Sequence, residues 1–587
     1  MLVQPKNSPI VSCQQSIRRR NAIMSKEDPT VSKVLATRAE ETASAGLASP
    51  RDLWVDGSEA LGGYSLRAFA GLLGGAALTG ALTGLGVATF KASVEAVASA
   101  LYGEPAVQFG MAASDAAILP WYTFVLPGAG GLAVAALRAA CGPAGLGPNL
   151  AGHVAEATSG ARPRPLASIG RTAAAVATLG SGCSLGPEGP AVEWGMFTSR
   201  CVEQLLEAPV LGVDSGVSQN LRFRRQLLAA GAASGVAAGF NAPLAGIVFA
   251  LEVVSDNVVT VARQAAESEA ADAAGQPVPR SAADASAAAE LDVKGKASLS
   301  MITIASLVSA LVVDFTLGQE LALRPAAMLP TPALEELPVY LMLCVGLGAA
   351  SGFVALTLAR GSKFVAGVFA GGGNNTAPGL LAPMPLWLRP AAGGFFCGAL
   401  GLAFPEVLFF GYSTLDAILA GPSTLPQGGV EPAVAAEALT LLVAKLAATA
   451  ICLGSGLVGG TFAPSLFLGA VLGVAFHGAA ASGLDAAIGE LQQLGAADLA
   501  TYLPHLSAAD RSSFASIGAA ATLAAVFRAP LTASLLIFEL TRGYELVLPL
   551  LAAAGTGPLV AITFAAAAKR SSAEAAARRG EADAGRA

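Results

Sequence analysis

Glu188 is the residue whose type and surroundings most clearly suggest a chemical role. It stands in Gly186-Pro187-Glu188-Gly189-Pro190, inside an apolar part of the chain. An ionisable carboxyl group is costly at membrane depth, so such a residue is a candidate for function. The glycines and prolines favour a helix start, where unpaired N–H groups and the helix dipole attract anions. A carboxylate there can occupy an anion site itself and vacate it on protonation or displacement. The alternative is a glutamate that only caps its own helix.

The stretch around Glu188 has a counterpart in the second half of the chain. The segment 180–190, GSGCSLGPEGP, is matched by 454–464, GSGLVGGTFAP. The segment 242–252, APLAGIVFALE, is matched by 529–539, APLTASLLIFE. Two paired motifs in the same order indicate two structurally related halves, whose relative orientation the repeat alone leaves open. Gly/Pro-interrupted apolar segments at corresponding positions are typical of transporter binding sites.

Composition places these motifs in a membrane protein. Of 587 residues, 54% are hydrophobic and only 13% charged, about half the charge of a soluble protein. The 68 Gly and 34 Pro come without a collagen period or a long polar tract, which excludes collagen and overall disorder. A net charge of −6 without a basic stripe gives no sign of a nucleic-acid partner. We expect no enzyme, because no Ser/His/Asp set and no metal-ligand cluster is present, and we expect the seven cysteines to be buried thiols.

Helix starts can hold an anion without Lys or Arg, and this matters for conduction. A conducting site must bind an ion well enough to admit it and weakly enough to release it. The alternative is that the glycines only permit close packing of membrane helices. Packing is the better explanation for any single glycine, whereas the duplicated motifs favour an anion site.

The motifs resemble those of the CLC family of chloride channels and chloride/proton antiporters over about residues 60–568. GPEGP at 186–190, FNAPLAGIVFALE at 240–252, GGTFAPS at 459–465 and FRAPLTASLLIFELT at 527–541 are similar to four family signatures. The resemblance implies an all-α polytopic membrane protein with two inverted-repeat halves of tilted, partly broken helices. It also implies a homodimer in membrane lipid, with one pore per subunit, a bound chloride or similar monovalent anion and no other cofactor.

The resemblance assigns roles by position. Glu188 matches the gating glutamate. The expected anion-binding positions are Gly145, Gly147, Gly186, Gly189, Gly460, Thr461 and Phe462. Four charged residues fall at positions that are mostly structural in the family: Glu252, Lys445, Arg528 and Glu539.

Several departures from the family pattern bear on mechanism. Pro187 stands where the family usually has Arg. The stretch 142–148, GPAGLGP, lacks the serine of the first pore motif, so Pro143 or Gly145 can face the ion, and the choice between chloride and nitrate stays open. No candidate for the family's pore tyrosine follows Tyr544, which predicts an altered or wider inner gate.

The departure at Val253 decides the predicted mode of transport. Family antiporters have a proton-relaying glutamate at this position, whereas Val253 has no titratable group. We therefore expect a passive, Glu188-gated chloride channel, with a chloride/proton or nitrate/proton antiporter that uses an atypical relay as the alternative. A secondary transporter of an organic solute is disfavoured, because the pore motifs hold no additional charged residues.

The chain ends are predicted to lie outside the membrane domain. Residues 1–60 are expected to be disordered, with a transit peptide at about 1–39, because this basic, Ser-containing stretch has no acidic residue before Glu27; a cytosolic tail is the alternative. The membrane domain is predicted at 61–568, with halves at about 61–260 and 298–568 and a polar loop at 261–297. A short polar tail at 569–587 and no C-terminal regulatory domains complete the expected organisation. The expected transit peptide favours location in a chloroplast membrane, either the thylakoid or the envelope.

Overall fold

The computed structural model describes the helical part of the chain. The described residues are 66–103, 120–142, 145–207, 221–255, 295–318, 335–370, 381, 383–420, 431–495, 502–504, 506–507 and 510–584. The predicted N-terminal region 1–60, Pro143 and most of the polar loop 261–297 lie outside them. Arg67–Ala587 forms one unit by its contacts, and the description below concerns this unit.

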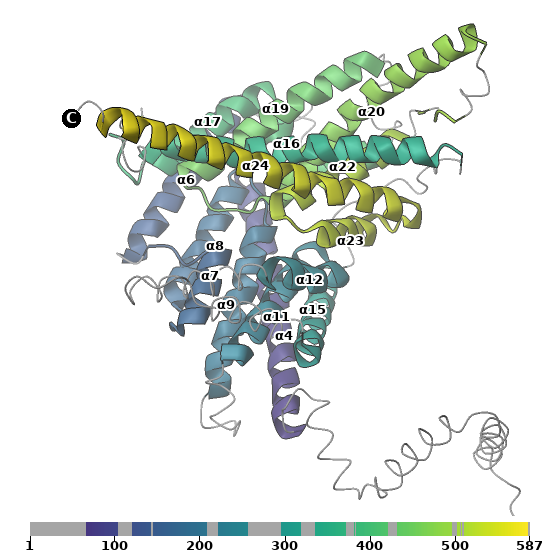
Figure 1. Cartoon of the computed structure of the whole chain (residues 1–587). Helices are drawn as coiled ribbons and strands as arrows, with labels where there is room; N and C mark the ends of the chain where they lie inside the picture. The colour runs from purple at the N-terminus through teal and green to yellow at the C-terminus, as the bar shows by residue number, and fades with distance from the viewer. Residues whose placement is uncertain are drawn as a thin grey trace, which may run out of the picture. The chain divides into compact units, whose positions relative to one another are not determined.

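Among the described residues, the first half of the domain holds eight α-helices (Figure 1), and it extends to Leu317, beyond the boundary at about residue 260 that the sequence analysis gave. They are α4 (Leu66–Tyr102), α6 (Pro120–Ala140), α7 (Leu150–Ser159), α8 (Pro165–Gly180), α9 (Glu188–Glu207), α11 (Leu221–Phe240), α12 (Pro243–Phe249) and α15 (Lys296–Leu317). A π-helical turn, Ala250–Val254, extends α12.

The second half repeats this order. It contains α16 (Leu337–Ala370), α17 (Arg389–Ala403), α18 (Tyr412–Ala420), α19 (Glu431–Ser455), α20 (Phe462–Gln493), α22 (Asp510–Phe527), α23 (Pro530–Thr541) and α24 (Val547–Ala584). Short 3₁₀ turns precede α18 and α24, at Pro405–Val407 and Tyr544–Leu546. Helix α24 continues through 569–584, the part that the sequence marks as a polar tail.

Backbone angles confirm that the two halves are structurally equivalent. Gly182 and Gly456, the third residues of the two GSG turns, have φ of 90° and 91°. Asn241 and Arg528, which precede the two Ala-Pro-Leu motifs, have φ of 55° and 57°. Left-handed angles are uncommon at non-glycine residues, so their recurrence at matched positions reflects one repeated fold.

Equivalent helices run in opposite directions. A Cβ on Gly131 of α6 would meet the carbonyl of Pro390 near the start of α17, and a Cβ on Gly394 would meet the carbonyl of Pro127. Because the sequence rises along one helix as it falls along the other, α6 and α17 are antiparallel. The predicted all-α fold with two inverted halves is therefore confirmed.

The lengths of the helices fit a membrane protein. Within the described ranges, seven helices are long and apolar enough to span a bilayer, and the helices Pro243–Val254 and Pro530–Thr541 are apolar but shorter. A full span needs about 20 residues, so these short helices cannot cross alone. Helices that end at membrane depth are tolerated where they lie within protein or line a cavity.

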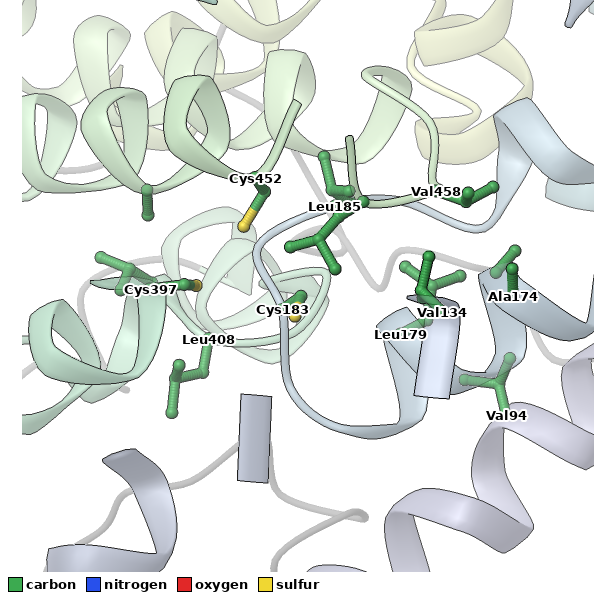
Figure 2. Close-up of a cluster of buried hydrophobic side chains, with 14 of the residues drawn as sticks. Val94, Val134, Ala174, Leu179, Cys183, Leu185, Cys397, Leu408, Cys452 and Val458 are labelled. Carbon is green, nitrogen blue, oxygen red and sulfur yellow. The ribbon is translucent and has the colours of Figure 1, made fainter. Parts of the chain in front are cut away.

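Buried thiols contribute to the apolar packing. Cys183, Cys397 and Cys452 have no exposed surface and belong to one core cluster, in which Figure 2 shows them with Leu408. The prediction of buried thiols also holds for Cys344, whereas Cys141 and Cys201 are partly exposed; Cys13 lies outside the described residues.

Candidate anion-binding site

Two glycines join the paired motifs of the two halves. The N–H of Gly186 donates to the carbonyl of Gly460 at 2.8 Å, and the N–H of Gly460 donates to the carbonyl of Gly186 at 2.7 Å. This antiparallel bridge is the single isolated β-bridge among the described residues. It places the starts of α9 and α20 side by side, and it occupies the N–H groups of both glycines. Gly186 and Gly460 therefore position the site rather than donate to an anion.

The close approach of the two backbones requires glycine. A Cβ on Gly189 would lie 2.6 Å from the Cα of Gly460, and a Cβ on Gly460 would lie 2.5 Å from the backbone N of Gly189. Such distances leave no room for a side chain. The same contact packs the two helices closely and brings their N-terminal ends together. Helix packing and anion binding therefore do not exclude each other as roles of these glycines.

The two helix starts have the same construction. In α9, Ala191 makes the first helical hydrogen bond, to the carbonyl of Pro187 at 3.0 Å. In α20, Ser465 does the same with Thr461, also at 3.0 Å. In each case a proline without an N–H precedes the first donor. The N–H groups before the proline have no acceptor in a preceding helical turn. They belong to Glu188 and Gly189 in α9, and to Phe462 and Ala463 in α20.

The carboxylate of Glu188 lies at these two helix starts. The residue has no exposed surface. A Cβ on Gly186 would lie 2.5 Å from Oε2 of Glu188 and 3.1 Å from the backbone N of Ala463, so the carboxylate lies beside the start of α20. The hydroxyl of Tyr412 donates to its Oε1, and Oε2 has no hydrogen-bond partner among the residues that the structure describes. A negative group thus occupies the position that the helix dipoles make favourable for an anion.

A lysine from the first helix supplies positive charge near the carboxylate. Nζ of Lys91 donates to the carbonyls of Ala238 at 3.0 Å and Gly239 at 2.5 Å, at the C-terminal end of α11. A Cβ on Gly239 would lie 3.7 Å from Cγ of Glu188, so the Lys91 Nζ that donates to the Gly239 carbonyl lies in the neighbourhood of Glu188. Lys91 therefore provides a cation near Glu188. The arginine that the family pattern usually has next to this glutamate is replaced by Pro187.

Aromatic side chains form an apolar wall around the start of α20. The ring of Phe462 is 5.8 Å from that of Phe240 and 5.7 Å from that of Phe249, between centroids. It also stacks on Phe527 at 3.9 Å. Apolar rings lower the local dielectric constant, which strengthens electrostatic interactions at the helix ends.

The loops that carry the two motifs are held by the core cluster. Figure 2 shows Cys183 and Leu185 of the first loop and Val458 of the second loop packed together with Leu179. Because apolar burial fixes both loops, the glycine bridge between them does not depend on its two hydrogen bonds alone.

Glu252 and Glu539, the last residues of the second motif pair, have structural partners. Glu539 accepts hydrogen bonds from the N–H groups of Leu244 and Ala245, at 2.9 and 2.7 Å. Glu252 accepts from those of Leu531 and Thr532, at 3.0 and 2.7 Å. Each glutamate thus caps the short helix of the other half, in line with the structural role expected from the sequence.

Val253 lies in the π-helical turn directly after Glu252 and is buried. Its side chain cannot titrate. The carboxylate beside it, Glu252, is already bound to α23.

A cavity of about 800 Å³ reaches the second motif. Thr461 lines it together with three basic residues, Arg360 and Lys363 of α16 and Arg528, which follows α22. The basic side chains are exposed, and the remaining lining is largely apolar. Arg528 therefore contributes to the cavity, which is more than the structural role expected from the sequence.

Two predicted positions have their N–H groups engaged elsewhere. Gly145, with φ of 64°, donates to the carbonyl of Gly142 at 3.0 Å, and Gly147 donates to that of Ala167 at 2.8 Å. A Cβ on Gly147 would also meet the backbone of Ser168. Neither glycine presents a free N–H group to an anion in this structure.

Sequence reasoning did not find three residues near Glu188: Lys91, Tyr412 and Ala463. Lys91 and Tyr412 come from helices outside the repeated motifs. Ala463 lies inside the second motif, and its position before Pro464 was a signal that the first turn of α20 starts there.

Comparison with known proteins identifies the family. The profile described as voltage gated chloride channel matches residues 130–266 and 290–561. Chloride channel protein CLC-e of Arabidopsis thaliana is 35% identical over 66% of this chain and 45% of its own length. CLC-f of the same plant is 32% identical over 65% of this chain and 40% of its own length. The chain thus spans less than half the length of these two relatives. The H(+)/Cl(-) exchange transporter ClcA of Cronobacter sakazakii is 29% identical over 64% of this chain and 62% of its own length.

Solved structures show the same fold. A slow cyanobacterial Cl-/H+ antiporter has a TM-score of 0.58 at 19% identity, covering 84% of this chain and 95% of that one. A eukaryotic CLC transporter has a TM-score of 0.55 at 18% identity, covering 85% and 73%. With the family profile, the fold and the four signature motifs in agreement, the chain belongs to the voltage gated chloride channel family, the CLC family of anion channels and transporters.

Proposed function

We propose that this protein is a chloride channel that conducts passively and is gated by Glu188. One observation carries the proposal: the buried Glu188 carboxylate lies at the starts of α9 and α20, where one Cβ position on Gly186 is 2.5 Å from its Oε2 and 3.1 Å from the backbone N of Ala463. Donors arranged for a carboxylate also suit a chloride ion, because both are monovalent anions. The bound chloride is the expected ligand, and no cofactor is required.

Gating follows from competition for one site. While the Glu188 carboxylate occupies the site at the starts of α9 and α20, an anion cannot bind there, and the path is closed. Protonation removes the charge that the helix ends attract, and displacement by an anion replaces it. Either event leaves the N–H groups free to bind the anion that passes.

The cavity at Thr461 provides a wide approach to this site. Arg360, Lys363 and Arg528 raise the local concentration of anions there. Their exposed positions keep the attraction moderate, because water screens it. Beyond Thr461 the helix ends replace these full charges, so that the ion is not held too tightly to leave.

Val253 supports passive conduction. A proton route from the side of α12 needs a titratable relay, and Val253 has none. Glu252 is engaged as a helix cap. A chloride/proton or nitrate/proton antiporter with an atypical relay is the second candidate, since several similar proteins bear exchanger names.

Location and assembly are parts of the same proposal. The composition of residues 1–60 supports import into a chloroplast and residence in the thylakoid or envelope membrane. Family membership supports a homodimer surrounded by lipid. Imaging residues 1–60 fused to a fluorescent protein tests the location, and a cytosolic signal would reject it.

Reversal potentials in planar bilayers test the mode of transport. With purified protein, a chloride gradient and equal pH on both sides, the potential is expected to equal the chloride equilibrium potential. A pH gradient at fixed chloride is expected to leave it unchanged. A shift with the pH gradient would instead establish coupled exchange.

A further inference from the structure

Tyr412 is the side chain in direct hydrogen-bond contact with the Glu188 carboxylate. It begins α18, a helix that carries none of the repeated motifs. We propose that Tyr412 belongs to the anion site: its hydroxyl holds the Glu188 carboxylate while the site is closed and the transported anion once the carboxylate has left. This inference rests on the proposed function and names a specific binding residue for it.

The backbone before Tyr412 is fixed by a glycine. Gly411 has φ of 82°, a left-handed angle that favours glycine. A Cβ at this position would lie 2.5 Å from the Phe467 ring of α20. The turn into α18 therefore packs directly against the helix whose N-terminus faces the carboxylate.

A buried lysine holds the preceding loop. Nζ of Lys445, which has no exposed surface, donates to the carbonyls of Val407 at 2.9 Å and Phe409 at 3.0 Å. The N–H of Phe409 donates in turn to the carbonyl of Gly182 at 3.1 Å. The position of the Tyr412 hydroxyl is thus set by contacts with both halves of the protein, including the first glycine turn.

The chemistry of a phenol suits both proposed partners. Its O–H group donates to a carboxylate oxygen and equally to a halide. It carries no charge, so it adds affinity without the strong hold of a buried cation. The tyrosine side chain has few rotatable bonds, and the position of its hydroxyl is already defined by the contact with Glu188. When the carboxylate leaves, the donor therefore remains directed at the vacated site.

Chloride binding to purified protein, measured by isothermal titration calorimetry, separates this role from a structural one. In the Glu188→Ala background, Tyr412→Phe is expected to raise the Kd for chloride about tenfold, the effect of losing one hydrogen bond to a charged group. With Glu188 present, the same substitution weakens the binding of the anion and also the binding of the Glu188 carboxylate that competes with it for the site. The two losses cancel, so the apparent Kd is expected to change by less than about threefold.

Tyr102→Phe is the matched control. The Tyr102 hydroxyl donates to the carbonyl of Ser181 at 2.8 Å, and its ring packs on Phe409 at 5.0 Å. It is a buried tyrosine of the same region without a contact to Glu188. Its substitution is expected to leave the Kd unchanged in both backgrounds.

The outcomes distinguish this inference from the function on which it rests. An equal increase of the Kd in both backgrounds would make Tyr412 a structural residue and overturn the inference. Unchanged binding in Glu188→Ala/Tyr412→Phe would also overturn it, while the helix-end site would stand. No chloride binding to Glu188→Ala would overturn the helix-end site and the role of Tyr412 together.

Discussion

Glu252 and Glu539 cap each other's helices across the two halves of the protein. Each carboxylate accepts hydrogen bonds at the start of the short helix in the opposite half, the helix that follows the Ala-Pro-Leu motif. The four hydrogen bonds to the backbone N–H groups range from 2.7 to 3.0 Å. This reciprocal capping locks α12 to α23. It satisfies helix ends that, at membrane depth, have no water to bind.

We expect Glu252→Ala and Glu539→Ala to destabilise the protein to a similar extent, by about 2 kcal/mol each. Each substitution leaves two N–H groups without an acceptor. Thermal unfolding in detergent measures the effect, and Glu545→Ala, at an exposed glutamate, is the control. Unchanged melting temperatures for both capping variants would show that the reciprocal capping does not stabilise the fold.

Glu188→Ala and Glu188→Gln are expected to raise open probability and to remove much of the pH dependence of the current. Neither side chain can place a negative charge at the helix ends or lose it on protonation. Single-channel recording at neutral and acidic pH measures both effects. If gating in the two variants matches that of the original protein, Glu188 is not the gate.

Gly460→Ala is expected to abolish anion flux. The new Cβ would lie 2.5 Å from the backbone N of Gly189, so α9 and α20 would have to separate. Chloride efflux from liposomes measures the effect. Gly483→Ala, in the same helix, is the control, because a Cβ there meets nothing within 4 Å. Equal flux through both variants would argue against the close backbone contact.

Removing positive charge from the cavity is expected to lower the chloride current. We expect Lys363→Ala to reduce it about twofold at low salt, because local anion concentration follows the potential of the cavity. The reduction is expected to shrink as salt screens the charge. Arg162→Ala, at an exposed arginine outside the cavity, is the control. A loss that is equal at all salt concentrations would point to a structural effect.

The repeated motifs predicted the fold, since each motif holds its own helix start together with the contact that it makes, and the anion site at these starts stays a prediction. The bridge of Gly186 and Gly460 was not predictable, because no local pattern shows which glycines meet across the two halves. For the same reason the sequence assigned these two residues to anion binding, whereas the N–H group of each donates to the carbonyl of the other. Tyr412 and Lys91 were missed because they reach Glu188 only through tertiary packing.

Whether an anion can take the place of the Glu188 carboxylate is decided by a crystal structure of the Glu188→Ala variant with bromide, since bromide replaces chloride and its anomalous signal locates it. We expect a bromide peak in the space vacated by the carboxylate, within hydrogen-bond distance of the Ala463 N–H. A site left empty, with bromide bound only elsewhere in the pore, would contradict this expectation.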